Sequence, residues 1–285
     1  MVEFEVPEID YERYSNRQLA AVPLVVLAVA LMVLVGSLVM TGVPVPLGID
    51  FTGGSEMTVQ TTMNNGQLRA TFDEPIASIQ KVEGSNSYVL TFETSDVGAL
   101  RQQAQDAGLH VLGSGATSAA FGTSNQKWAL IGLVIAFLGM SLVAFALFRT
   151  FVPSLAIVAS AFSDLVIPLA VLSLLRIKLS LGVVAGLLML IGYSVDSDIL
   201  LTNHILRRSG GFYESTARAM RTGVTMTLTS IAAMAVMAVM ATLFRIDIMA
   251  SIGLVLVIGL TADLMNTYML NLSLLRWYKY EGVSR

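Results

Sequence analysis

Two aspartates lie near the middle of a long apolar segment, in the stretch LLMLIGYSVDSDILLTNHILRR at residues 187–208. A carboxylate at the centre of a membrane helix raises the free energy of inserting that helix by about 3 kcal/mol. An amide side chain offers similar hydrogen bonds without the charge. Burial disfavours the charged form of a carboxyl, and an acid that exchanges protons at membrane depth is what a proton relay requires. We therefore interpret Asp196 and Asp198 as candidate ion-relay residues.

Other apolar segments carry residues that could complete such a relay. Asp164 lies in the third apolar run, Arg221 immediately precedes the fifth, and Asp263 shares a helical face with Asn266 and Thr267 in the sixth. The same side chains could instead only hold helices together through hydrogen bonds. The spacing leaves both interpretations open, and it does not decide whether the ion would be H⁺ or Na⁺.

The two central aspartates point in different directions on a regular helix. They are two residues apart, which places them about 200° apart around the axis. Asp196 shares its stripe with Gly192, a packing position, whereas Asp198 shares its stripe with Ser194 and Thr202. Hydroxyls could continue a proton path, which favours Asp198, but the sequence does not decide which acid faces the relay.

The elements that must position these residues are membrane helices. The chain has 285 residues, of which 55% are hydrophobic and only 13% are charged, against about 25% charged residues in soluble domains. Each apolar run reaches the roughly 20 residues that span a bilayer. The six runs cover residues 19–40, 128–148, 152–175, 179–201, 222–243 and 248–270. We expect a six-helix membrane bundle.

Lysine and arginine residues predict the orientation of this bundle. They gather in the flanks on the side of the N-terminus, whereas the short loops on the other side hold only Arg176, Lys178 and Arg245. The positive-inside rule then places both termini in the cytoplasm. The expected parts are a cytoplasmic tail (1–18), the first span (19–40), an extracytoplasmic domain (41–127), the remaining bundle (128–275) and a second tail (276–285).

The extracytoplasmic segment predicts a small α+β domain. Strands are expected at SEMTVQTT, ASIQKVE, SYVLTFE and LHVLGSGATSAAF, with a GSNS turn between the second and third. Helices are expected at GQLRATF and at SDVGALRQQAQDAG, the latter capped by Ser95 or Asp96 and ended by Gly108. The order β-α-β-β-α-β is the ferredoxin-like arrangement. The small, polar segment GSGATSAAFGTSNQ is expected to be a flexible hinge or an ordinary loop.

Several classes of function are disfavoured by what the sequence lacks. It has no cysteine, two histidines, and a net charge of −3. Thiol chemistry, cysteine or histidine metal clusters and a basic nucleic-acid surface are therefore not expected. Nucleotide-binding loops, zinc-protease motifs and a nucleophile elbow are absent from the sequence as well. We expect a protein that is not an enzyme and needs no cofactor or metal.

Two motifs resemble the SecD/SecF protein-export family. The stretch GIDFTGGS (48–55) follows the first apolar run, as the signature of that family does, and LIGYSVDSDILL (190–201) is similar to the fourth-helix signature of SecF-like members. The resemblance assigns Gly48, Asp50, Phe51, Gly53 and Gly54 to a signature loop. We expect this loop to be structural, with the glycines allowing its turn. A direct contact of Phe51 with an exported client is the alternative.

The resemblance also transfers the fourth-helix motif residue by residue. The Asn, Asp and Thr of the common bacterial form correspond to Asp196, Ser197 and Asp198 here, so the acid is doubled around its usual place. The bacterial His-Asp pair of the third helix becomes Ser163 and Asp164. The fifth-helix motif matches at Arg221, Thr222 and Thr225, and Asp263 replaces a small polar residue. These departures resemble archaeal members.

The family implies a function and partners. SecF-like proteins belong to the resistance-nodulation-division superfamily and assist the Sec translocase together with SecD. The resemblance thus implies a SecD-like partner, a SecY-type translocon, an unfolded translocating polypeptide and surrounding membrane lipid, in the cytoplasmic membrane. The alternatives are an exporter of small solutes or lipids from the same superfamily, and a passive scaffold of the translocon without ion coupling.

Overall fold

The structure is a computed structural model that describes residues 11–82, 85–207, 211–244 and 246–282. The chain forms two compact units. One comprises residues 47–130, and the other comprises the described residues on either side of that range. The boundary between the units falls inside a single helix, α5 (Ala119–Phe148).

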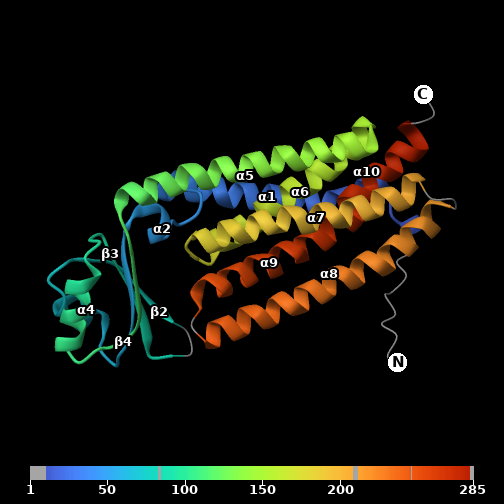
Figure 1. The fold of residues 1–285 in the computed structure, drawn as a ribbon. Helices are drawn as coiled ribbons and strands as arrows, with labels where there is room; N and C mark the ends of the chain where they lie inside the picture. Colours follow the sequence, from blue (N-terminus) through green and yellow to red (C-terminus); the bar gives the residue numbers. More distant parts are fainter. Residues whose placement is uncertain (1–10, 83–84, 208–210, 245, 283–285) are drawn as a thin grey trace, which may run out of the picture. The chain divides into compact units, whose positions relative to one another are not determined.

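The larger unit is helical. Among the described residues, six helical segments are long and apolar enough to cross a membrane, and Figure 1 shows them as a set of long helices. The first five are α1 (Asn16–Thr41), α5, α6 (Phe151–Leu174), α7 (Leu181–Arg207) and α8 (Phe212–Leu243). The sixth consists of α9 (Asp247–Met265), the π-helical turn η2 (Asn266–Asn271), α10 (Leu272–Trp277) and the π-helical end η3 (Tyr278–Gly282).

The helices α6 and α7 form the centre of this unit together with the sixth span. The most apolar stretch of α6 is 67% buried and that of α7 is 50% buried, whereas only 6% of the corresponding stretch of α5 is buried. Leu187 and Leu190 of α7 pack with Val255 and Leu256 of α9 in the main hydrophobic core. Polar side chains on the inner faces of α6 and α7 are therefore enclosed by protein rather than by lipid.

Glycines bring α7 close to α9. A Cβ atom on Gly182 would lie 3.0 Å from the Ile248 carbonyl oxygen, and one on Gly186 would lie 3.4 Å from a Val255 methyl group. Small residues allow such close packing of membrane helices. Both glycines thus allow α7 to pack closely against α9 inside the bundle.

The chain before the first span is held by a buried arginine of the last helix. The short turn η1 (Tyr11–Arg13) precedes α1. Arg276 of α10 donates to the carbonyl oxygens of Tyr11 (2.9 Å) and Tyr14 (2.7 Å), and also to the side chain of Asn16. Burial raises the pKa of Tyr11 to about 12, so its phenol stays neutral where it packs against the bundle.

The smaller unit has the expected ferredoxin-like fold. A short helix, α2 (Ile49–Thr52), leads into the order β1-α3-β2-β3-α4-β4, and the four strands form one sheet in the order β2-β3-β1-β4. All neighbouring strands are antiparallel. The elements are β1 (Gly54–Gln60), α3 (Asn65–Thr71), β2 (Ile76–Val82), β3 (Ser87–Phe92), α4 (Val97–Asp106) and β4 (His110–Thr117).

Local sequence signals account for these elements. Asn64 and Gln67 form a capping box at the start of α3, and Asp96 accepts the Ala99 amide at the start of α4. Gly108 adopts a left-handed φ of 73° just after α4, which favours glycine. Residues 83 and 84 lie outside the described residues, so the first part of the expected GSNS turn is not described.

The expectation of a flexible hinge or loop after the last strand was wrong. Residues up to Thr117 belong to β4, and α5 begins at Ala119, well before the apolar run at Trp128. The small residues of this segment are used for pairing, since Gly113 and Ser114 lie opposite Thr58 and Met57 of β1. Composition indicated flexibility, but the pairing with β1 orders this part of the chain.

Candidate functional site

Three carboxyl groups from three membrane helices are buried in the centre of the helical unit. Asp164 of α6, Asp198 of α7 and Asp263 of α9 are each at most 1% exposed. They lie on the inner faces of the helices that form the core. We call these three residues the acid cluster.

Each acid of the cluster accepts hydrogen bonds from other helices. Asp164 accepts from the Ser194 hydroxyl (2.5 Å) and from the Asn266 amide (2.5 Å), one on each oxygen. Asp198 accepts on Oδ1 from the Thr267 hydroxyl (2.9 Å) and the Asn271 amide (2.8 Å). Its Oδ2 has no hydrogen bond from the described residues.

Ser197 and Thr267 join the acids into one network. The Ser197 hydroxyl lies 2.9 and 3.0 Å from the two oxygens of Asp263. The Thr267 hydroxyl lies 3.2 Å from Asp263 and 2.9 Å from Asp198. A hydroxyl carries a single proton, so Thr267 cannot donate fully to both acids at once. Asp198 and Asp263 therefore compete for one donor.

The network contains no balancing cation within the described part of the chain. All hydrogen-bond donors to the three acids are serine, threonine or asparagine side chains. Three buried anions without a paired cation would be very costly. Such a cluster can persist if it takes up protons or another cation, and this is the chemistry that the arrangement offers.

The π-helical turn η2 explains how the sixth span supplies two amides to the cluster. Asn266 and Asn271 are five residues apart, which on an α-helix would place them about 140° apart around the axis. In η2 the amide of Leu272 instead bonds to the carbonyl of Thr267, five residues earlier. This wider turn brings residues five apart onto one face. A search at α-helical spacing finds Asn266 and Thr267 but misses Asn271.

Two of the expected relay residues lie outside the acid cluster. Asp196 is exposed on α7, and Arg221 is exposed on α8, as are Thr222 and Thr225 beside it. The structure thus brings Asp164, Asp198 and Asp263 together, whereas Asp196 and Arg221 lie on the surface of this single chain. Ser194, which the sequence offered as a hydroxyl beside Asp198, donates to Asp164 instead. Ser197, which stands at the position of the bacterial acid, donates to Asp263.

The signature loop is a site of close backbone packing in the smaller unit. Gly53 and Gly54 have left-handed φ angles of 78° and 104°. A Cβ atom on Gly53 would lie 2.6 Å from the Ala119 Cα, and one on Gly54 would overlap the Phe92 carbonyl oxygen. Phe51 is buried, with 3% of its surface exposed. These contacts favour a structural role for the loop over direct contact with a client.

Neighbouring residues of α5 complete this packing. A Cβ atom on Gly122 would lie 2.7 Å from the Gly53 amide nitrogen, and Asn125 donates to the Asp50 carbonyl oxygen at 3.0 Å. The sequence offered no signal for Gly122, which lies in a segment of small residues with no periodic pattern.

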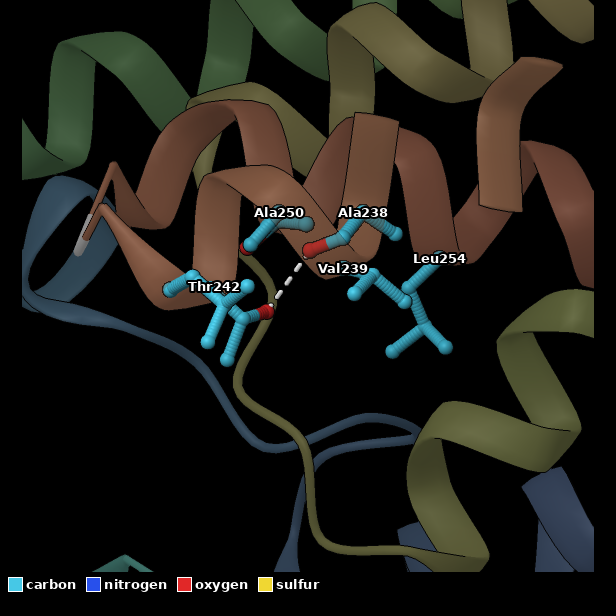
Figure 2. A pocket seen from close by; sticks show the side chains of 7 residues that line it. Ala238, Val239, Thr242, Ala250 and Leu254 are labelled. Atoms are coloured by element: carbon cyan, nitrogen blue, oxygen red, sulfur yellow. Dashed lines mark hydrogen bonds between the residues drawn. The ribbon is translucent and has the colours of Figure 1, made fainter. Parts of the chain in front are cut away.

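A shallow pocket of about 410 Å³ lies elsewhere, between α8 and α9. Figure 2 shows its lining, which is mostly aliphatic (Ala238, Val239, Leu254), with the Thr242 hydroxyl bonded back to the Ala238 carbonyl oxygen at 2.7 Å. It brings no group of polar side chains together. Within the described residues, no set of three or more His, Cys, Asp or Glu side chains is arranged to hold a metal ion.

Two protein-family models match the sequence of this chain. Residues 101–281 match the family model "Protein export membrane protein SecD/SecF, C-terminal", and residues 39–64 match the "SecD/SecF GG Motif". The first match covers most of the chain. This chain belongs to the SecD/SecF protein-export family. The GG motif of the family contains Gly53 and Gly54 of the signature loop.

Curated relatives identify the SecF branch of this family. The chain is 63% identical to the protein-export membrane protein SecF of Haloferax volcanii over 287 residues, and 57% identical to that of Haloquadratum walsbyi over 291 residues. Both comparisons cover 100% of each protein. The expected SecF resemblance is therefore confirmed, and the chain is a SecF-type accessory subunit of protein export.

A solved structure confirms the fold class. SecDF of Thermus thermophilus, described as a translocon-associated membrane protein, superposes with a TM-score of 0.75 at 19% identity. The match covers 96% of this chain but only 39% of the SecDF chain. The combination of six membrane helices with a small α+β unit is thus shared with SecDF, whose chain is much longer.

Proposed function

We propose that this SecF-type subunit couples ion movement through the acid cluster to its work in protein export, together with a SecD-family partner. The observation that carries this proposal is the burial of three carboxyl groups whose donors are all uncharged. Protons or another cation must neutralise such a cluster in a membrane. Gain and loss of that charge would change the competition of Asp198 and Asp263 for Thr267, and with it the packing of α7 against the sixth span.

The setting of this function follows from the family and from the charge distribution. We place the chain in the cytoplasmic membrane with both termini in the cytoplasm, because the positive flanks gather on that side. The smaller unit would then lie outside, where it would meet the emerging unfolded polypeptide. A SecY-type translocon and membrane lipid are the further partners. We propose no enzymatic activity for the chain.

Asp198→Asn is the variant that tests ion coupling. The amide oxygen can keep the hydrogen bonds from Thr267 and Asn271, and the amide nitrogen takes the place of Oδ2, which has no bond from the described residues. The variant should therefore fold and assemble. We expect it to lose the stimulation of export, measured in membrane vesicles with an imposed H⁺ or Na⁺ gradient, because the side chain no longer titrates.

Two controls separate coupling from assembly. Asp106→Asn removes one exposed carboxylate from the end of α4 and should leave export unchanged. Protein level and recovery of the SecD-family partner should equal wild type in both variants. Full stimulation by Asp198→Asn would contradict the ion-coupling proposal and would support the passive scaffold. Dependence on only one of the two gradients would identify the ion.

A further inference from the structure

A tyrosine hydroxyl is buried without a partner in the helical unit. Tyr268 lies in the π-helical turn η2 and is 5% exposed. Its hydroxyl makes no hydrogen bond with any residue that the structure describes. Burial of a hydroxyl without a bond is unfavourable, and a phenylalanine would fill nearly the same space without that cost. Packing alone therefore gives no reason for the hydroxyl.

The neighbouring helix α8 makes room for this hydroxyl. A Cβ atom on Gly223 would overlap the Tyr268 hydroxyl, so any other residue at this position would push the hydroxyl away. Gly223 is buried in the interior of α8, where a glycine is less favourable than an alanine. The glycine thus weakens the helix locally, and the space that it leaves is filled by the tip of the phenol.

A second buried phenol meets α8 one turn away. The Tyr11 hydroxyl donates to the Met220 sulfur at 3.5 Å, and Tyr11 is 6% exposed. Because Met220 and Gly223 are three residues apart, the two hydroxyls meet α8 about 4.5 Å apart along its axis. Tyr11 and Tyr268 also belong to one hydrophobic cluster. We call these two tyrosines the phenol pair.

The phenol pair extends from the acid cluster towards one end of the helical unit. Tyr268 is within electrostatic reach of Asp263, Asp198 and Tyr11. It follows Asp263 by five residues on the sixth span, and Arg276, further along the same span, holds the Tyr11 carbonyl oxygen at 2.9 Å. The order from the centre outwards is therefore the acid cluster, Tyr268 and Tyr11.

We propose that the phenol pair carries protons between the acid cluster and the end of the helical unit that holds Tyr11, which is the cytoplasmic end in the proposed orientation. A hydroxyl can accept a proton on its oxygen while it releases its own. The O–H bond of a carboxyl in the cluster breaks, a new O–H bond forms on Tyr268, and the original proton of Tyr268 passes on to Tyr11. Each phenol is neutral before and after the transfer.

The phenol pair has this role only if the acid cluster couples ion movement to export, as proposed above, and only if the ion is H⁺. A hydroxyl passes a proton on by exchanging one O–H bond for another, which a sodium ion cannot do. A phenol that must accept and donate in turn is also better left without one fixed partner, as the Tyr268 hydroxyl is among the described residues.

Removal of single hydroxyls tests the phenol pair. The chain is expressed with its SecD-family partner, and a pH-sensitive dye follows proton uptake into membrane vesicles with an imposed H⁺ gradient and an exported client. Tyr268→Phe and Tyr11→Phe should each lower the uptake that depends on this chain by about 100-fold, the lower end of what one positioned proton-transfer group contributes. Tyr14→Phe is the matched control, because Tyr14 is 48% exposed, and it should leave uptake unchanged.

The same variants distinguish a proton path from a structural role. Since the Tyr268 hydroxyl makes no bond with a described residue, Tyr268→Phe should keep or exceed the folded yield and unfolding temperature of the wild type. The double variant Tyr11→Phe/Tyr268→Phe should lose no more uptake than the slower single variant, because both phenols act on one path. Two independent structural effects would multiply instead.

A substitution in α8 tests where the hydroxyl lies. Gly223→Ala should lower the unfolding temperature and the proton uptake of the otherwise wild-type chain, because the added methyl group overlaps the Tyr268 hydroxyl. In the Tyr268→Phe background the overlap is removed, and the nearest ring atom would lie 3.4 Å away. Gly223→Ala should therefore lower the unfolding temperature less there. Equal losses in the two backgrounds would place the hydroxyl elsewhere and overturn the path.

The outcomes separate failure of the phenol pair from failure of ion coupling. If Asp198→Asn keeps full stimulation of export, ion coupling fails and the phenol pair fails with it. If Asp198→Asn loses stimulation but Tyr268→Phe takes up protons as fast as Tyr14→Phe, only the phenol pair is wrong. Poor folding of Tyr268→Phe would assign its hydroxyl a structural role, and stimulation by a Na⁺ gradient alone would exclude a proton path. Either result overturns the proposal.

Discussion

At the scale of single residues, Gly54 is the position in the signature loop where substitution is least tolerable. Its φ of 104° disfavours any side chain, and a Cβ atom would overlap the Phe92 carbonyl oxygen. Strain and overlap together should lower the free energy of unfolding by about 2–5 kcal/mol in Gly54→Ala. Pulse proteolysis of the full chain in detergent, scored by cleavage within residues 47–130, measures this change.

Gly113→Ala is the matched control for that substitution. It also lies in the sheet, but its Cβ position is open, so the change should stay within about 0.5 kcal/mol. Equal resistance of the two variants to protease would mean that the loop moves to make room and that the glycine pair serves another purpose, such as contact with a client.

At the scale of the element, the π-helical turn η2 has the geometry of an α-helix into which one extra residue has been inserted. Deleting Met269 would leave Asn266 and Asn271 separated by four positions, which an α-helix places about 40° apart. Both amides would still face Asp164 and Asp198. We therefore expect the deletion variant to keep a wild-type yield and unfolding temperature in detergent, measured by size-exclusion chromatography and thermal unfolding.

Deletion of Val257 in α9 is the comparison for η2. It removes a residue from a regular α-helix and rotates the two flanking parts by about 100° relative to each other. Asp263 and the packing partners of α7 could not then all keep their places, so folded protein should be lost. If the two deletions are equally harmful, η2 is not an added residue within an otherwise regular helix.

At the scale of the whole molecule, the orientation in the membrane can be measured directly because the chain has no cysteine. Glu214→Cys at the start of α8 and Ser114→Cys in β4 both lie at exposed positions. We expect a membrane-impermeant maleimide to label Ser114→Cys in intact cells, and to label Glu214→Cys only after the membrane is opened. The positive-inside rule requires this result. The opposite pattern would place the smaller unit in the cytoplasm.

The sequence by itself determined the features that depend on neighbouring residues. Hydropathy over about 20 residues located the six spans, and caps, turns and alternation predicted the β-α-β-β-α-β order. The signature loop and the fourth-helix motif indicated the family, which the comparisons confirm. Each of these signals is read within one segment, so no knowledge of packing was needed.

The tertiary structure decided which polar residues meet. Sequence spacing showed that Asp196 and Asp198 face different sides of α7, but only the packing of α6 and α9 buries Asp198 and leaves Asp196 exposed. Asp164 bonds to Asn266, 102 residues away, and a π-helical turn that periodicity does not reveal brings Asn271 to Asp198. Contacts of this kind depend on the positions of several helices at once, so they cannot be predicted from the sequence of a single segment.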